Sequence, residues 1–507
     1  MLTRKKIQTT ILLIFGILLL VNLISDRFFF RWDFTADQRY SLSSATKDIL
    51  KSLDEPVTVT AYFSENLPPN IQQVRDDFKD LLIEYNNASN GNVVYEFINP
   101  NENQEQEIKA QKSGIQPIMI NVREKDQVKQ QKAYLGALVQ MGDKKDVIPF
   151  IQPGAAMEYA LSTSIKKLSM KTKLKVALLQ GNGEPTLDEM PQLHKSLSVM
   201  YDVKPITFTD TSGVPSEYKT LVIIAPADTM NPNYFKYLDE FVSRGGRLLV
   251  ALNTVKGDFS KNQGEKVYTG LSNWLKKFGV EVKPNFVVDA HCSNVMVRQK
   301  QGMFVMNTPV SFPYLPIINN FADHPITKGL ETVMMPFASQ INIEPKDTTI
   351  SIIPIATSSD KSGVEDLPVY FNIQKQWGAV DFNISDIPVA VAVEGKLENN
   401  TPTKMVVFSD GDFVVNGKGQ QAQRLQPDNI SLMVNAIDWL SDDTGLIALR
   451  TKGVTSRPID PSLEASTKTF LKYLNFLLPI LLIIFYGIFR FQRRKRIKEK
   501  LKNTHYV

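Results

Sequence analysis

Hydrophobic and polar positions divide the sequence into one long apolar segment near its C-terminal end and many short amphipathic segments before it. Residues 473–489 contain no charged side chain, which predicts a membrane-spanning helix near the lower length limit for crossing hydrocarbon. A second apolar run, at residues 11–21, follows three basic residues. Because no pair of small residues marks a cleavage site after this run, we predict an uncleaved anchor at residues 11–30 rather than a signal peptide.

Basic residues flank both apolar segments. Eight Lys or Arg and one Glu follow Phe489, and three basic residues lie within residues 1–10. Because Lys and Arg accumulate on the cytoplasmic side of membrane helices, we expect a second membrane helix at residues 471–490, a cytoplasmic tail at 491–507 and both termini in the cytoplasm. The main body would then lie outside the membrane. The alternative for the C-terminal apolar run is a buried helix with a solvated basic end.

Between the two anchors, apolar positions switch repeatedly between a period of two and a period of about 3.6, which predicts interleaved strands and helices. In residues 31–170 the predicted strands are 57–63, 93–98, 118–122 and 133–141, and the predicted helices are 71–85, 102–112 and 155–168. This order is that of a thioredoxin-like domain. No cysteine follows the first strand, so we expect a binding or spacer role instead of redox chemistry.

Residues 171–450 repeat the alternation on a larger scale. The predicted strands are 174–179, 203–208, 221–226, 247–252 and 405–408, and the predicted helices are 187–200, 232–243, 271–278 and 429–440. This α/β order predicts a doubly wound, flavodoxin-like sheet, and it resembles the non-catalytic relatives of class I glutamine amidotransferases. Residues 290–400, which contain short strands and prolines, are interpreted as a β-rich insertion, and residues 451–470 as a linker.

Charge and cysteine content narrow the class of protein. The chain carries a net charge of +5, of which residues 1–10 contribute +3 and the tail +7, so the remaining residues carry −5. The body therefore has no excess positive charge with which to bind nucleic acid. Cys292 is the single cysteine, so neither an intrachain disulfide nor a cysteine-based zinc site can form. A large outer body without disulfides is typical of a bacterial envelope protein, here with its body in the periplasm and its anchors in the inner membrane.

Short motifs along the chain resemble one family. They are Asp33-x-Thr35, Arg39-Tyr40-Ser41-Leu42-Ser43, Glu55-Pro56-Val57, Asp323-His324-Pro325-Ile326-Thr327, Ser409-Asp410-Gly411-Asp412-Phe413 and Asn435-x-x-Asp438-Trp439-Leu440. Together they resemble the GldG-type auxiliary proteins, which are gliding-motility-associated membrane subunits of an ABC transporter. The resemblance covers nearly the whole chain. It implies a non-catalytic subunit whose partners are an ABC permease, a separate cytoplasmic ATPase, membrane lipid and, in gliding members, the motility apparatus.

The sequence contains few groups suited to catalysis. It has neither a P-loop nor a Gly-x-Ser-x-Gly nucleophile motif. His291 and Cys292 are adjacent, but neighbouring side chains of an extended segment point to opposite faces, so they would not form a dyad. Met296, Met303 and Met306 are expected in a core or on a partner surface. We therefore predict no enzyme activity, no catalytic residue and no cofactor.

Two loops lie where doubly wound sheets bind ligands, at the carboxyl ends of predicted strands. The ligand-binding candidates are Gly181, Asn182, Gly183, Glu184, Asp410 and Asp412. Asp410 and Asp412 could also hold a cation together with water and carbonyl oxygens, although no metal site is predicted. The simpler interpretation is that the glycines form turns and that one Asp caps the following helix.

Three functions are consistent with these patterns. The first is the auxiliary transporter subunit. The second is a membrane-tethered extracytoplasmic receptor with its pocket in the crevice above the doubly wound sheet. The third is a membrane-anchored hydrolase that uses Asp410 and Asp412 with a metal. The two predicted anchors and the lack of an ATP-binding motif favour the first.

Overall fold

The computed structural model describes residues 41–503 except 125–126, 152–156, 171, 302–303, 346–348, 399–400, 420–421, 443–445 and 448–464, together with residues 13, 14 and 16. The chain forms two units, residues 1–453 and residues 454–507. The predicted first anchor, residues 11–30, therefore lies outside the described residues except at those three positions.

The first folded domain contains a four-stranded mixed sheet. Its strands, in spatial order, are β2 (Val93–Ile98), β1 (Val57–Phe63), β5 (Leu135–Met141) and β6 (Lys144–Ile148). β1 runs parallel to β2 and antiparallel to β5, and β6 is antiparallel to β5. Val57, Val59, Ala61 and Phe63 of β1 all enter the main core of this domain, whereas Tyr62 enters a smaller core on the other face.

Four helices cover this sheet: α2 (Ser44–Lys51), α3 (Pro69–Ala88), α4 (Gln104–Lys112) and α5 (Met157–Ser169). α2, α3 and α5 line the main core, and α4 lines the smaller one. Side chains before two of the helices explain where they begin. Ser43 accepts a hydrogen bond from the Thr46 N–H, and Asn103 accepts one from the Gln106 N–H, so each occupies the N-cap position that short polar residues prefer.

The hairpin of β3 (Ile118–Glu124) and β4 (Gln127–Ala133) stands apart from this sheet as a two-stranded ribbon. The predicted strands 118–122 and 133–141 correspond to β3 and β5, of which only β5 joins the sheet. β4 and β6 are not among the predicted strands, and β6 takes the edge position next to β5. β4 reads QVKQQKA, a composition unsuited to a strand buried on both faces. Gly142, with φ of +55°, turns the chain between β5 and β6 and is the local signal that the prediction missed.

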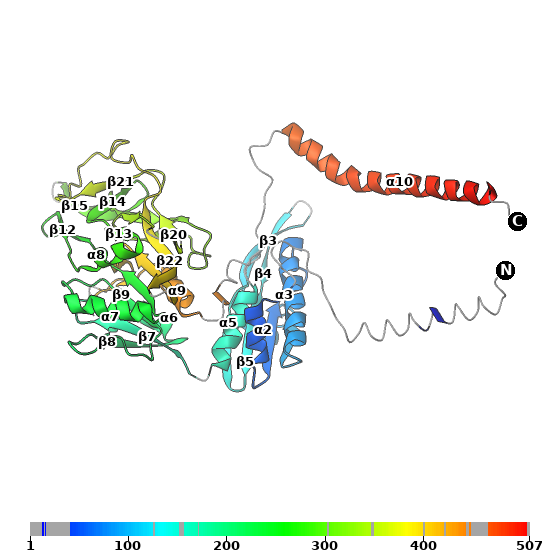
Figure 1. Ribbon diagram of the computed structural model, residues 1–507, viewed down its shortest axis with the longest axis horizontal. Helices are drawn as coiled ribbons and strands as arrows, with labels where there is room; N and C mark the ends of the chain where they lie inside the picture. The colour runs from blue at the N-terminus through cyan, green and yellow to red at the C-terminus, as the bar shows by residue number, and fades with distance from the viewer. Residues whose placement is uncertain are drawn as a thin grey trace. The chain divides into compact units, whose positions relative to one another are not determined.

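The second domain carries the labels α6 to α9 in Figure 1. It is built on an eight-stranded sheet with the order β17-β20-β22-β23-β10-β9-β7-β8. Five neighbouring strands are parallel: β7 (Leu174–Gln180), β8 (Tyr201–Thr207), β9 (Thr220–Ile224), β10 (Arg247–Ala251) and β23 (Thr401–Phe408). Numbered along the chain, they lie in the order 2-1-3-4-5, which is that of flavodoxin-like doubly wound sheets. The antiparallel strands β22 (Pro388–Glu398), β20 (Ile350–Thr357) and β17 (Asn320–Phe321) extend this sheet.

Apolar side chains alternate along the parallel strands and pack on both faces. On β9, Val222 and Ile224 enter one core, and Leu221 and Ile223 enter the other. The first face is covered by α6 (Pro191–Leu197) and α9 (Pro427–Ser441), and the second by α7 (Pro232–Ser243), α8 (Leu271–Leu275) and the short helix η2 (Lys276–Phe278). The loops at the carboxyl ends of the strands are therefore free to meet at one edge of the sheet.

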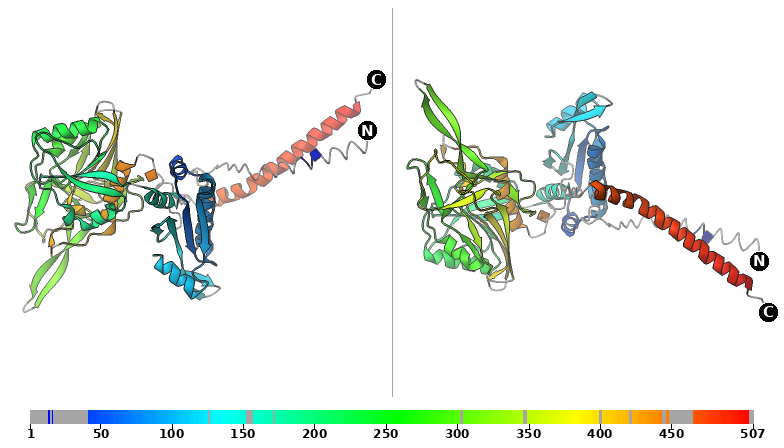
Figure 2. Two further views of the ribbon diagram at one scale, coloured as in Figure 1. Left: turned by 90° about the horizontal axis from the view of Figure 1, so that it is seen from below. Right: turned by 90° about the horizontal axis from the view of Figure 1, so that it is seen from above.

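Between β10 and β23 the chain forms many short paired strands. The pairs are β11 (Val255–Asp258) with β12 (Gln263–Lys266), β13 (Val280–Val282) with β19 (Ile341–Ile343), β14 (Asn285–Asp289) with β21 (Ser362–Asp366), β15 (Cys292–Gln301) with β16 (Phe304–Ile318), and β16 with β18 (Val333–Met334). An aromatic core that includes Phe286, Phe312 and Tyr314 joins several of them. The β15–β16 hairpin projects from the rest of the domain in both views of Figure 2.

The helix α10 (Ala465–Asn503) lies in the second unit. Its segment Lys472–Ile497 has a mean hydropathy of 2.0, and none of it is buried within the chain. By length and composition, α10 is the one helix among the described residues that could cross a membrane. It contains the predicted membrane segment 471–490, and the basic residues from Arg490 onward continue the same helix without a break.

Candidate functional site

The predicted ligand-binding residues lie in loops at the carboxyl edge of the parallel strands. Four loops meet there, and we call residues 181–184, 225–228, 253–254 and 409–412 the rim. They follow β7, β9, β10 and β23 respectively. The topology thus brings the predicted loops to the edge at which doubly wound sheets bind ligands. Their use as a binding site depends on which polar groups are not already hydrogen-bonded within the fold.

The loop after β7 closes around two of its own side chains. The Asn182 N–H donates to Glu184 Oε2 at 2.6 Å, and Asn182 Nδ2 donates to Glu184 Oε1 at 3.0 Å. Both side chains are buried. The Asn182 carbonyl oxygen accepts from the N–H groups of Ala227 and Asp228 at 3.0 and 2.9 Å, which ties this loop to the one that follows β9.

Gly181 and Gly183 give this loop its shape. Their φ values are +112° and +79°, in the region that side chains other than hydrogen rarely allow. A Cβ atom on Gly183 would lie 3.0 Å from the Cβ of Ala227. The two glycines therefore form a turn and permit a close approach between two loops, and ligand binding by Gly181, Asn182, Gly183 and Glu184 stays a prediction.

After β23, Asp410 is fully buried. Its Oδ1 accepts from the Asp412 N–H at 2.7 Å, whereas its Oδ2 has no hydrogen-bond partner among the described residues. Burial, with the nearby Asp412 carboxylate as a second cause, raises the pKa of Asp410 well above its ordinary value. The carboxyl group therefore favours its neutral form, since a charge without a partner is costly inside a protein.

Asn253, which follows β10, links the other parts of the rim. Its Oδ1 accepts from the Gly411 N–H at 2.8 Å, and its Nδ2 donates to Asp412 Oδ2 at 2.9 Å. Gly411 also packs directly on Ala225, because a Cβ atom there would lie only 2.7 Å from the Ala225 nitrogen. Sequence reasoning missed Asn253, although its place directly after a predicted strand was a usable signal.

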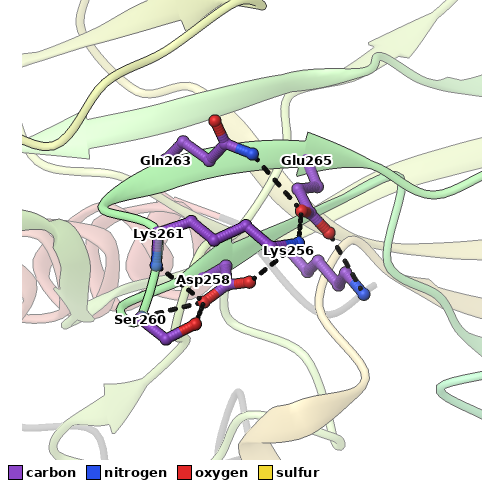
Figure 3. Close-up of polar contacts among 6 residues, drawn as sticks. All are labelled: Lys256, Asp258, Ser260, Lys261, Gln263 and Glu265. Atoms are coloured by element: carbon purple, nitrogen blue, oxygen red, sulfur yellow. Dashed lines mark hydrogen bonds and ion pairs between the residues drawn. The ribbon is translucent and has the colours of Figure 1, made fainter.

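The β11–β12 hairpin begins at Val255, directly after the rim residues that follow β10, and its polar groups compensate one another (Figure 3). Asp258 Oδ1 accepts from the N–H groups of Ser260 and Lys261 at 2.8 and 3.1 Å, and Lys261 Nζ lies 2.6 Å from Glu265 Oε1. The Ser260 hydroxyl, with these other donors, lowers the pKa of Asp258 to about 2. The hairpin is thus a closed network of opposite charges.

Glycines allow this hairpin to lie flat on the aromatic core. Gly257 faces Gly264 across the hairpin, and a Cβ atom on either would overlap a ring, that of Phe337 or of Phe286 respectively. The segment that carries Phe337 continues to Ser339, whose N–H donates to the Ser409 carbonyl oxygen at 3.2 Å. The β-rich segment is therefore attached to the rim at the end of β23.

The polar groups of the rim are mostly used by the fold itself. Asp412 is exposed, but one of its oxygens is held by Asn253, and Asp410 lies below the surface. Among the described residues, no three His, Cys, Asp or Glu side chains are grouped as a metal site needs. The rim is therefore a set of four loops fixed by hydrogen bonds, with the buried carboxyl group of Asp410 beneath them.

Two further sequence motifs meet on α9. His324 Nδ1 accepts from the Ile326 N–H at 3.2 Å, and the ring of His324 packs edge-on against Trp439 with 5.2 Å between centroids. Asn435 Nδ2 donates to the Ile326 carbonyl oxygen at 2.8 Å. Burial lowers the pKa of His324. The His-Pro-Ile-Thr turn therefore packs against the Asn-x-x-Asp-Trp-Leu helix and is hydrogen-bonded to it. Contacts within the fold explain both motifs.

Cys292 and the methionines have simple surroundings. Cys292 is the first residue of β15, and burial raises the pKa of its thiol, which disfavours the reactive thiolate. Met296 is 66% exposed and so lies on the surface rather than in a core. The side chains of Met303 and Met306 lie outside the described residues.

Comparison with known families decides the class of the chain. The family model of auxiliary proteins described as "ABC-type uncharacterized transport system" matches residues 173–441, which is more than half of the chain. The chain belongs to this family. A second model, a domain of unknown function named DUF7088, matches residues 36–140. Members of the family are auxiliary components of an ABC transport system, and this supports a non-catalytic role.

Individual proteins that resemble the chain add no function. The chain is similar to an uncharacterized protein of Borreliella burgdorferi, with 22% identity over 92% of this chain and 94% of the relative. Among solved structures it is similar to the mmIFT52 N-terminal domain, with 14% identity, a TM-score of 0.35 and coverage of 53% of this chain and 98% of that one. It is also similar to a ThuA-like protein from Parabacteroides merdae, with 13% identity, a TM-score of 0.30 and coverage of 53% and 91%.

Proposed function

We propose that this chain is a non-catalytic auxiliary subunit of a bacterial ABC transport complex. Its main body lies in the periplasm, α10 spans the inner membrane, and its partners are a permease and a separate cytoplasmic ATPase. Family membership supports the link to transport. The observation that carries the proposal further is α10, whose apolar side chains are exposed along the whole membrane-length segment. Lipid or another membrane helix must cover them.

The sequence of α10 favours a protein partner along one side of this helix. Asn475 and Pro479 lie four residues apart and therefore on the same face. A polar side chain in hydrocarbon finds its best partner on a neighbouring helix, and the carbonyl that Pro479 leaves without an N–H donor needs a partner as well. We infer that this face of α10 contacts the permease, while the basic residues from Arg490 onward stay on the cytoplasmic side.

The two folded domains would act as a binding and spacing body outside the membrane. We infer that the first is thioredoxin-like without redox chemistry, because the residues after β1 are Ser64-Glu65-Asn66-Leu67 rather than cysteines. In the second domain the rim is occupied by its own hydrogen bonds. Both features support a role in protein contacts over one in turnover. In hosts that glide, the complex would serve the motility apparatus, as the resemblance to GldG-type proteins implies.

The test is purification of the tagged full-length chain from native membranes in a mild detergent. We expect a multi-spanning permease and a soluble-type ATPase to co-purify in fixed ratio. A chain that elutes alone, while both partners are present in the membrane, would contradict the proposal. Loss of gliding, or of transport in a non-gliding host, after deletion of the gene would then separate the two downstream roles.

A matched pair of variants tests the helix itself. Replacing residues 473–489 with leucines keeps the length and apolar character but removes Asn475 and Pro479, so we expect normal insertion and weakened assembly. Leu477→Ile is the control, because it alters an apolar position without removing either feature. Equal recovery of the permease with both variants would reduce α10 to a passive anchor.

A membrane-tethered receptor is the second candidate. A polar depression in the β-rich segment, lined in part by His291, Asp360 and Asp386, favours it. This depression is separate from the rim. The receptor hypothesis can therefore place the ligand here instead of in the crevice above the doubly wound sheet.

A further inference from the structure

A depression of about 610 Å³ lies on the β-rich part of the second domain. Its lining includes six long polar side chains: His291, Asn319, Asn320, Asp360, Lys361 and Asp386. They come from four separate segments, which follow β14, precede and begin β17, connect β20 to β21, and precede β22. All six side chains are exposed. The fold thus gathers residues that are far apart in the sequence into one open hollow.

A buried carboxylate fixes one side of this depression. Asp289, at the end of β14, is fully buried. Its Oδ1 accepts from the His291 N–H at 2.8 Å and from the Ser359 hydroxyl at 2.6 Å, and its Oδ2 accepts from the Ser359 N–H at 2.8 Å. Three donors thus satisfy one carboxylate, so the backbone under His291, Asp360 and Lys361 is held in a single arrangement.

Serine hydroxyls fix the segment before β22 to the loop that holds Asp360 and Lys361. The Ser358 and Ser362 hydroxyls lie 2.6 Å apart, Ser358 Oγ accepts from the Ile387 N–H, and Ser362 Oγ donates to the Ile384 carbonyl oxygen. Asp386, between these two contacts, has φ of +55° and accepts at Oδ1 from Asn320 Nδ2 at 2.7 Å. The framework beneath the hollow is therefore built from buried, mutually satisfied polar groups.

The groups at the mouth differ from this framework. The side chains of His291, Asp360 and Lys361 form no hydrogen bond or ion pair with any described residue. Asp360 and Lys361 are neighbours with opposite charges, yet they do not pair. Held on a rigid frame and left unpaired, these groups are arranged in the way that binding sites require.

The chemistry of the lining narrows the ligand. Two carboxylates would repel a phosphate or another anion, and Lys361 would repel a divalent cation. The lining among the described residues has no Phe, Tyr, Trp or large aliphatic side chain for an apolar molecule. A hydroxyl group both donates and accepts hydrogen bonds, so it can use carboxylates, carboxamides, an imidazole and an ammonium group alike. The open shape also admits one end of a longer molecule.

We propose that this depression binds a saccharide unit through hydrogen bonds from its hydroxyl groups to Asp360, Lys361, His291 and the Asn320–Asp386 pair. The site would let the body of the protein contact a sugar or glycan outside the membrane. This inference goes beyond the transport-subunit proposal and does not rest on it, because binding can be measured whether or not a permease co-purifies.

Saturation-transfer NMR on the full-length chain in lipid nanodiscs tests the proposal, since a sugar-headed detergent would itself compete. The panel contains glucose, galactose, mannose, N-acetylglucosamine and their common disaccharides, with glycine, inorganic phosphate and Ca²⁺ as comparators. We expect at least one saccharide to bind with a Kd below about 10 mM. No saccharide binding below that limit would overturn the proposal, as would binding of glycine, phosphate or Ca²⁺ in place of sugars.

Variants locate the binding. The double variant Asp360→Ala with Lys361→Ala removes two exposed side chains that form no hydrogen bond or ion pair with a described residue. It should therefore keep its unfolding temperature and lose at least about tenfold in saccharide affinity. The control, Asp188→Ala with Lys236→Ala, changes the same residue types elsewhere in the domain and should bind as the parent does. Equal saccharide affinity for both double variants would place the sugar elsewhere and overturn the assignment.

Discussion

The rim and the depression belong to the same domain, and both are rich in polar side chains. The two regions differ in whether these side chains form hydrogen bonds within the fold. At the rim, Asn182 is satisfied by Glu184, and Asn253 joins Gly411 to Asp412. At the depression, the side chains of His291, Asp360 and Lys361 stand on a satisfied framework and form no hydrogen bond or ion pair with a described residue. A position at the carboxyl end of a strand therefore shows where polar groups gather, but only their partners show whether they remain free for a ligand.

This difference has an energetic basis. Buried polar groups are nearly always hydrogen-bonded, because an unsatisfied one costs about 1–3 kcal/mol. Most polar groups in the closely packed loops of the rim bond to one another, although Ser409 Oγ and Asp410 Oδ2 have no partner among the described residues. The exposed groups of the depression are hydrated instead, so the fold can leave them unpaired at little cost. Substitutions at the rim should therefore change stability strongly, and substitutions at the depression should hardly change it.

The largest effect on the free energy of unfolding is expected for Gly411→Ala. The added Cβ would meet the backbone nitrogen and Cα of Ala225 at 2.7 and 2.8 Å, and neither atom can rotate away. We expect a loss of about 2–3 kcal/mol in the free energy of unfolding, as for other overpacked sites, measured by urea unfolding of the purified chain. Gly378→Ala is the control, because no atom lies within 4 Å of a Cβ at that position. Similar values for both variants would show that the rim is not closely packed.

Asp410→Asn should act in the opposite direction and stabilise the protein at neutral pH. The folded pKa of Asp410 is raised, so its contribution to stability is fully present below the unfolded pKa of about 3.9 and is lost as pH rises toward the folded value. Over that interval the wild type loses about 1.4 kcal/mol per pH unit from this group. Asn does not titrate, so the advantage of the variant should grow with pH.

Unfolding curves of the wild type and Asp410→Asn across a pH series measure this difference directly. Asp188→Asn, at an exposed position, serves as the control and should follow the wild type at every pH. A constant difference between Asp410→Asn and the wild type across the series would mean that folding does not shift the pKa of Asp410, and would contradict the prediction.

His324→Asn should show a smaller dependence with the reverse sign. Burial lowers the folded pKa of His324, and Glu394 and Lys404 are the charged groups that face it. Its contribution to stability is therefore present above the unfolded pKa of about 6.5 and is lost as pH falls toward the folded value. Asn can still accept from the Ile326 N–H but does not titrate. We expect the wild type to lose stability relative to the variant on acidification, and parallel pH profiles would contradict this.

Much of the parallel sheet could be predicted because its signals are local. α7 begins and ends at the predicted residues, Pro232 and Ser243, since Asn231 caps it, Pro232 suits its first turn and Gly245 follows its end. β9 is a continuous apolar run, as expected for a strand covered on both faces. The placement of the loops after β7 and β23 at one edge followed from the topology rule alone.

The rest depends on contacts between distant residues. β14 pairs with β21 across more than seventy residues, and no local pattern specifies that choice. The burial of Asp410 under its neighbours and the convergence of four segments on the depression have the same origin. In the first domain, the predicted strand 118–122 is β3, which pairs with β4 in a separate ribbon instead of joining the sheet, because alternation marks a strand but not its partner.

The smallest expected effect on stability, and the one that sharpens the comparison most, comes from Asp360→Ala. Asp360 is exposed and has no partner among the described residues, so its removal should change the free energy of unfolding by less than about 0.5 kcal/mol. Asp386→Ala removes the acceptor of the Asn320 side chain and replaces a residue at positive φ, so it should cost about 1 kcal/mol or more. The two carboxylates line the same depression. Urea unfolding of both variants therefore shows whether Asp386 belongs to the hydrogen-bonded framework and Asp360 to the exposed mouth. If Asp360→Ala were as destabilising as Asp386→Ala, the mouth would be part of the fold, and the contrast with the rim would disappear.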